Sequence, residues 1–217
     1  MYITYFILGI TILISLKGFN EPDFKRKLLM NPYDVVHYKK WYRTFTHAFI
    51  HADFMHLGFN MYVLYMFGIG SFNGGGNTPY LKSLEPSFID DFGLIGYWYF
   101  FLLYAGGILF SSLYSIFKHK DNPHYSSLGA SGAVSAVIFG CILLNPQARL
   151  GLIFLPEALY LPAYLFGPLI LITEYYMAKR GGTRIAHDAH ILGALFGIVF
   201  TIAINPDYIV KFINSIF

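Results

Sequence analysis

Long apolar segments dominate this chain, and short stretches rich in glycine, proline and charged residues separate them. The apolar segments cover about residues 1–19, 54–72, 94–117, 128–145, 163–178 and 186–204. A helix needs ~20 predominantly apolar residues to cross the hydrocarbon core of a bilayer. Charged residues make up 12% of the chain, whereas soluble domains carry about 25%. We therefore predict an all-α integral membrane protein, a single domain of residues 1–217 with six transmembrane helices.

Two polar tracts mark the predicted loops most clearly. Residues 74–79 read Gly-Gly-Gly-Asn-Thr-Pro, and Gly181-Gly182 separates the fifth apolar segment from the sixth. Glycine and proline of this kind interrupt helices and favour turns. The long stretch between the first and second segments mixes lysine pairs with Trp41, Tyr42 and Phe45. Such a mixture is typical of a loop that lies partly embedded at the membrane interface.

Composition also limits the partners. The net charge is +3 and the basic residues are spread over several loops, so we expect the lipid bilayer as a partner and no nucleic acid. Cys141 is the single cysteine and lies in an apolar segment, where we expect it to be a small packing residue.

Polar side chains gather at the starts of the second, fourth and sixth segments. These segments cross the membrane in the same direction, so their starts share one side of the bilayer and a similar depth. The residues are His47, His51, His56 and Asn60; Ser131 and Ser135; and His187, Asp188 and His190. Polar groups inside a membrane are costly, and their convergence predicts a functional site.

Ser131 and His190 supply the pair that acyl transfer requires, because a serine hydroxyl becomes a strong nucleophile only when a base takes its proton. His56 and Asn60 are spaced i, i+4 and project from one helical face, so we expect both to donate hydrogen bonds to an oxyanion. The backbone N–H of Ser131 at a helix start adds a donor, and we group Gly129 with these donors.

No acidic residue suits the role of orienting the base. Asp188 lies two positions before His190, about 200° around a helix, and points away from it. We therefore expect a Ser–His dyad, with Asp188 as an N-terminal cap or dipole partner of the sixth helix.

Small residues form two faces that predict close helix packing. Gly132, Ala136 and Gly140 repeat at every fourth position of the fourth segment, and Gly193 and Gly197 do so on the sixth. Faces of this type let membrane helices approach closely. Contact between the two faces would bring the hydroxyl to the imidazole.

The motifs resemble those of the rhomboid intramembrane serine proteases. Residues 43–51 are similar to the end of that family's first loop, and residues 56–61 to its His-x-x-x-Asn signature. Residues 129–132, Gly-Ala-Ser-Gly, match its nucleophile motif, and residues 189–197 resemble its final Ala-His-x-x-Gly-x-x-x-Gly helix; residues 104–107 echo its third.

The resemblance implies a six-helix rhomboid-like bundle with a long, partly embedded first loop. It also implies hydrolysis of peptide bonds in or next to transmembrane segments of membrane-protein substrates, without metal or cofactor. Ser131 is then the nucleophile, His190 the base, and His56 and Asn60 the oxyanion donors.

The sequence departs from the family pattern at three places. Tyr42-Arg43 stands where Trp-Arg is common, and no acidic residue lies near Phe72. Ser135 stands where many members carry an aromatic ring that packs on the base, which leaves the orientation of His190 open.

Several alternatives compete with a peptidase. Ser131 alone could be a helix-packing serine. His47 and His51 could bind a metal at i, i+4, but no further ligand completes a set, so we expect both to structure the first loop together with Arg43. A catalytically silent rhomboid-like protein that binds transmembrane helices is the main rival function, and a small transporter is a weaker one.

Two arguments predict opposite orientations of the chain in the membrane. The resemblance suggests a bacterial inner membrane with the active site open to the non-cytoplasmic side. That topology places every basic residue outside except Lys82, Arg149 and Lys211, against the positive-inside rule.

Overall fold

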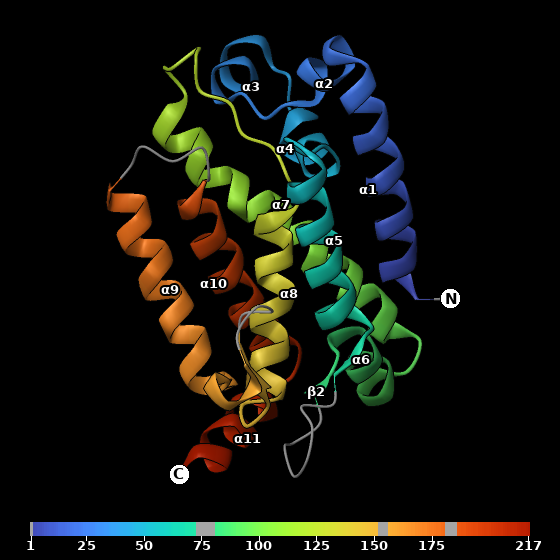
Figure 1. Ribbon diagram of the computed structural model, residues 1–217, viewed down its shortest axis with the longest axis vertical. Helices are drawn as coiled ribbons and strands as arrows, with labels where there is room; N and C mark the ends of the chain where they lie inside the picture. The colour runs from blue at the N-terminus through green and yellow to red at the C-terminus, as the bar shows by residue number, and fades with distance from the viewer. Residues whose placement is uncertain (1, 73–80, 152–155, 181–185) are drawn as a thin grey trace.

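The computed structural model describes residues 2–72, 81–151, 156–180 and 186–217. Six helices are the longest in these ranges and form the bundle in Figure 1: α1 (Ile3–Asn20), α5 (Phe54–Gly68), α7 (Ile95–His119), α8 (Ser131–Leu144), α9 (Ala163–Arg180) and α10 (His187–Ile204). Each corresponds to one predicted apolar segment. The loop tracts predicted at residues 74–79 and 181–182 lie outside the described residues.

Shorter elements close both ends of the bundle. They are α2 (Pro22–Leu28), α3 (Pro32–Tyr38), α4 (Arg43–Thr46), η1 (His47–Phe49), α6 (Leu84–Phe92), η2 (Glu157–Leu159) and α11 (Asp207–Ile216). Two short antiparallel pairs join β1 (Ser71–Phe72) to β2 (Leu81–Lys82) and β3 (Arg149–Leu150) to β4 (Leu161–Pro162). The sequence predicted none of these elements individually.

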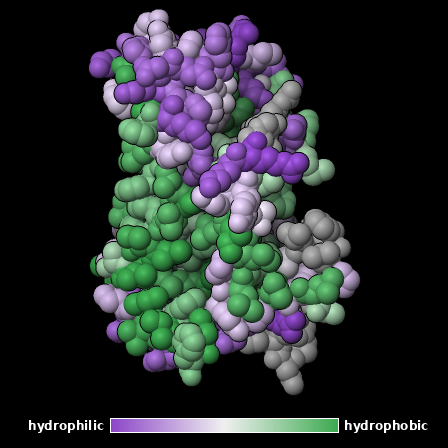
Figure 2. Space-filling model, turned by 90° about the vertical axis from the view of Figure 1, so that its left-hand side faces the viewer, coloured by the Kyte–Doolittle hydropathy of each residue, from purple (hydrophilic) through white to green (hydrophobic). Residues whose placement is uncertain are grey.

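In the described part of the chain, α1, α7 and α10 are long and apolar enough to cross a bilayer. The helix α8 is equally apolar but covers only Ser131–Leu144, which is shorter than a full crossing requires. Figure 2 shows a broad hydrophobic belt on one face below a hydrophilic cap, and the cap lies at the end of the molecule that carries α2 and α3. The chain is therefore a mostly helical membrane protein, and the count of six spans stays a prediction.

Helix α8 occupies the centre of the bundle, with α1 and α9 at opposite edges (Figure 1). Its buried residues surround the whole helix and include Val137, Phe139 and Cys141. A helix that is apolar on every side belongs in an interior. Burial of Cys141 among these residues agrees with its predicted packing role.

The small-residue faces bring α8 and α10 into near-backbone contact. A Cβ atom added at Gly193 would lie 2.0 Å from the carbonyl oxygen of Gly132, and one added at Gly197 would lie 2.2 Å from that of Ala136. At Gly140 an added Cβ would lie 2.9 Å from Oγ1 of Thr201. No larger side chain fits at Gly193 or Gly197, so these glycines determine the separation of the two helices.

The first loop is an ordered cap. Arg43 is buried at 8% exposure, donates to the carbonyl of Leu29 over 2.8 Å and pairs with Asp34 at 3.2 Å. An isolated bridge between Met30 and Ser127 joins this loop to the segment that leads into α8. The loop thereby positions the start of α8.

Candidate active site

Ser131 and His190 lie side by side at the starts of α8 and α10. The hydroxyl Oγ of Ser131 is 2.7 Å from Nε2 of His190, a hydrogen-bond distance that fits a nucleophile and its base. Ser131 is the first residue of α8 and His190 lies in the first turn of α10. The close approach of these helices at Gly193 makes this contact possible.

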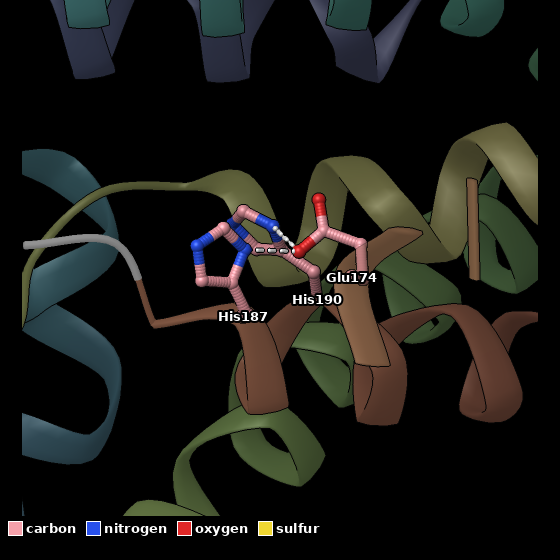
Figure 3. A group of neighbouring side chains, drawn as sticks. All are labelled: Glu174, His187 and His190. Atoms are coloured by element: carbon pink, nitrogen blue, oxygen red, sulfur yellow. Dashed lines mark hydrogen bonds and ion pairs between the residues drawn. The ribbon is translucent and has the colours of Figure 1, made fainter. Parts of the chain in front are cut away.

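Glu174 of α9 binds the opposite side of the imidazole, a contact that the sequence did not predict. Its Oε2 lies 3.1 Å from Nδ1 of His190 and 2.6 Å from Nδ1 of His187, as Figure 3 shows. A carboxylate only accepts hydrogen bonds, so Nδ1 of His190 carries a proton. The nitrogen Nε2 is then left as the acceptor that faces Ser131, which is the tautomer a general base needs.

We expected a Ser–His dyad without an acid, but Glu174 does contact the base His190, so this expectation is wrong. Glu174 is the only acidic residue in the fifth apolar segment, and an isolated ionisable residue within a membrane segment is itself a signal of function. The fifth segment ends on the side where the sixth begins. This connectivity was sufficient to place Glu174 near His190.

Asp188 forms an ion pair with Lys118 and does not cap the sixth helix. Its carboxylate binds Nζ of Lys118 at 2.8 Å, and α10 has Ala186 at its N-cap without a side-chain cap. The predicted capping role is wrong. Its position in the first turn of α10 still suits the favourable interaction of an acid with the positive end of a helix.

His56 is placed to donate toward the nucleophile loop. Its Nδ1 accepts a hydrogen bond from the backbone of Ala52 at 3.4 Å, which leaves the ring proton on Nε2. A Cβ atom added at Gly129 would lie 2.9 Å from this Nε2, so the absence of a side chain there lets the ring approach. Gly129 also has a φ of 109°, a conformation that favours glycine.

The other predicted oxyanion donors differ in availability. Asn60 is buried and its Nδ2 donates to the carbonyl of His56 at 2.9 Å, which uses one of its two amide protons. The N–H of Gly129 donates to the carbonyl of His47 at 2.9 Å. It is therefore not available to an oxyanion, contrary to the prediction. Ser131 begins α8, where backbone N–H groups have no intrahelical acceptor.

His47 and His51 attach the first loop to the site. Nε2 of His47 lies 2.9 Å from Oγ of Ser112 on α7, and Nδ1 of His51 lies 2.9 Å from Oγ of Ser15 on α1. Nε2 of His51 accepts from the N–H of Ala130 at 3.4 Å. Burial lowers the pKa of His47 to about 4 and, together with nearby His56, that of His51 to about 3. Both rings are neutral structural links near pH 7.

A small cavity lined partly by serine side chains lies next to the nucleophile. Its volume is about 20 Å³, and its lining includes Ser111, Ser112, Ser115 and Ser131. A cavity of this size holds about one water molecule when polar partners surround it. Water is therefore able to reside next to Ser131 inside the apolar bundle.

One group of donors in the described residues has the composition of a metal site. Glu174, His187 and His190 offer ligand atoms that lie within 4.8 Å of one another. His47 and His51, the metal pair considered from the sequence, instead have Ser112 and Ser15 as ring partners.

Comparison with known proteins identifies a family and several relatives to which the chain is similar. Residues 38–206 match the family model described as the Rhomboid domain. The chain is 29% identical over 165 residues to RHOMBOID-like protein 12, mitochondrial, of Arabidopsis thaliana, an alignment that covers 69% of this chain and 42% of that protein. It is 28% identical over 152 residues to the presenilin-associated rhomboid-like proteins, mitochondrial, of Danio rerio (protein A) and Homo sapiens, over 70% of this chain and 34% and 35% of those proteins.

The alignments thus span 34–42% of the length of these relatives. All three carry mitochondrial names, which contradicts the expectation of a bacterial inner membrane and removes the basis for its non-cytoplasmic opening. The expectation of an integral membrane protein agrees with the apolar helices.

Proposed function

Because the chain belongs to the rhomboid family, we propose that it is an intramembrane serine endopeptidase that hydrolyses peptide bonds in or next to transmembrane segments of other membrane proteins. The observation that carries this proposal is the 2.7 Å contact between Oγ of Ser131 and Nε2 of His190. A packing serine has no need of an imidazole that is itself oriented by a carboxylate. We also propose that α1, α5, α7, α9 and α10 cross the bilayer within one domain of residues 1–217, and that the predicted fourth span, residues 128–145, crosses it with α8 as its helical part.

The proposed reaction proceeds through an acyl-enzyme. Oγ of Ser131 attacks the carbonyl carbon of the scissile peptide bond while Nε2 of His190 takes the hydroxyl proton. Glu174 stabilises the imidazolium that forms, because its carboxylate accepts the hydrogen bond from Nδ1. The imidazolium then protonates the leaving amine as the carbon–nitrogen bond breaks.

The oxyanion that forms in each step requires donors that are in place before the reaction. Nε2–H of His56 and the backbone N–H of Ser131 are the best-placed donors, and the free amide proton of Asn60 is the third candidate. A water that enters after the amine has left attacks the carbonyl carbon of the acyl-enzyme while Nε2 of His190 takes its proton. The bond between the acyl carbon and Oγ of Ser131 then breaks, and the imidazolium returns the proton to Oγ.

Covalent labelling with a fluorescent fluorophosphonate tests the nucleophile. We expect labelling of the full chain in detergent micelles, its loss in Ser131→Ala, and a large decrease in His190→Ala. Ser135→Ala is the matched control, since this serine lies one turn away on α8 and should leave labelling intact. Labelling that persists in Ser131→Ala refutes the assignment, and a folded wild-type chain without labelling favours a silent protein that binds transmembrane helices.

A further inference from the structure

His187 has no role in the proposed peptidase reaction. The residue is 7% exposed, and its Nε2 is buried without a hydrogen-bond partner in the described part of the chain. Its Nδ1 nevertheless meets the same Oε2 of Glu174 that binds His190 (Figure 3). A carboxylate needs only one imidazole, that of His190, to orient the base, so the contact of the same oxygen with His187 requires another explanation.

We propose that Glu174, His187 and His190 form a Zn²⁺ site and that occupation of this site switches the Ser131–His190 pair off. The inference rests on the proposed function for its inhibitory part, whereas the metal site itself does not. Two histidines and one glutamate are a donor set that Zn²⁺ accepts, with a water as the fourth ligand. Imidazole donors favour Zn²⁺ over Mg²⁺ and Ca²⁺, which prefer oxygen ligands.

The distances allow the ion to enter with small side-chain movements. Zinc ligands at about 2.0–2.2 Å from the metal lie roughly 3.3 Å apart in a tetrahedron. Oε2 of Glu174 is now 2.6 Å from Nδ1 of His187 and 3.1 Å from Nδ1 of His190, and all three donors lie within 4.8 Å of one another. The side chains of Glu174 and His190 are 21% and 18% exposed, which leaves access for the ion and its water.

Zinc at this position removes the base. When Nδ1 of His190 binds the metal, the single proton of the neutral ring must lie on Nε2. Nε2 then donates to Oγ of Ser131 and is unable to accept its proton. The carboxylate of Glu174, which orients the ring in the metal-free enzyme, is at the same time bound to zinc. Removal of the metal by a chelator restores the original tautomer, so the inhibition is reversible.

Direct binding tests the site independently of catalysis. Zn²⁺ is titrated into the full chain in micelles against a chromophoric chelator, with Mg²⁺ as the control ion. We expect one equivalent of Zn²⁺ to bind wild type and Ser131→Ala, and at least about tenfold weaker binding in His187→Gln and Glu174→Gln, since even the partners of zinc ligands contribute 10–100-fold to affinity. His124→Gln, at an exposed histidine, is the matched control and should bind like wild type.

Inhibition is measured on the same samples as the rate of fluorophosphonate labelling relative to each variant's own metal-free rate. We expect Zn²⁺ to suppress labelling of wild type, excess chelator to restore it, and the inhibitory concentration to rise at least about tenfold in His187→Gln. Absence of a bound equivalent, binding unchanged in both ligand variants, or binding without suppression of labelling each overturns the proposal. A chain that binds Zn²⁺ at these residues but never labels instead contradicts the peptidase assignment, and thermal unfolding verifies that each variant is folded.

Discussion

Replacement of Glu174 by glutamine tests whether the carboxylate orients and stabilises the base. At 3.1 Å and an effective dielectric constant of 20, a carboxylate and an imidazolium attract by about 5 kcal/mol. Both side chains are about one-fifth exposed, so solvent screening reduces this value. Glutamine still offers an oxygen acceptor, and a charged hydrogen bond exceeds a neutral one by roughly 1–2 kcal/mol.

We therefore expect Glu174→Gln to lose about 1.5–3 kcal/mol of transition-state stabilisation, which is a decrease of roughly 10- to 150-fold in kcat. KM should change little, because Glu174 contacts Nδ1 of His190, whereas Ser131 contacts Nε2 on the other side of the ring. Glu174→Asp keeps the charge and should recover part of the loss. The assay is steady-state cleavage in proteoliposomes, together with thermal unfolding of each variant. A folded Glu174→Gln enzyme with kcat within twofold of wild type refutes the positioning role.

Three further perturbations test the surrounding structure. Gly193→Ala places a Cβ 2.0 Å from the carbonyl oxygen of Gly132. Overpacking of this kind should cost about 1–3 kcal/mol of stability and slow fluorophosphonate labelling of Ser131. Gly58→Ala is the control, because the added Cβ meets no neighbouring atom within 4 Å, and it should change neither stability nor labelling. His56→Ala removes an oxyanion donor and should decrease kcat by roughly 100- to 1000-fold while thermal stability stays unchanged. A decrease in thermal stability that accompanies the loss of kcat would instead indicate a structural role. Burial lowers the pKa of His47 to about 4, so between pH ~6.5 and pH 4 the unfolded chain binds a proton that the folded chain does not. The free energy of unfolding should therefore fall by up to about 3 kcal/mol as the pH is lowered from ~6.5 to 4. His47→Gln should make this pH dependence smaller in unfolding measurements.

The sequence predicted the long helices well because apolar runs and their proline boundaries determine them locally. Helix α8 ends at Leu144 and α10 at Ile204, directly before Asn145-Pro146 and Asn205-Pro206. The short helices of the first loop were not predicted, because their aromatic and basic residues follow no simple period. Their positions depend on tertiary contacts such as that of Arg43 with Asp34.

Within the site, residues that share a motif were easier to find than residues that meet only in space. The sequence indicated Ser131 and His190 as partners, and the small-residue faces indicated how they meet. Glu174 was not predicted because it lies on a different helix, α9, and meets His190 only in space. The N–H of Gly129 was assigned as a donor because nothing in the sequence shows that the carbonyl of His47 accepts it.

Cleavage of membrane-embedded substrates is the strongest test of whether Ser131 hydrolyses peptide bonds within a membrane. The full chain is reconstituted into liposomes with a library of peptides that each contain one transmembrane helix, and products are identified by mass spectrometry. We expect the wild-type chain to cleave peptides in or next to the transmembrane segment and Ser131→Ala to cleave none. Equal cleavage by Ser131→Ala, or no cleavage by a wild-type chain that is folded and reacts with fluorophosphonate, would contradict this expectation.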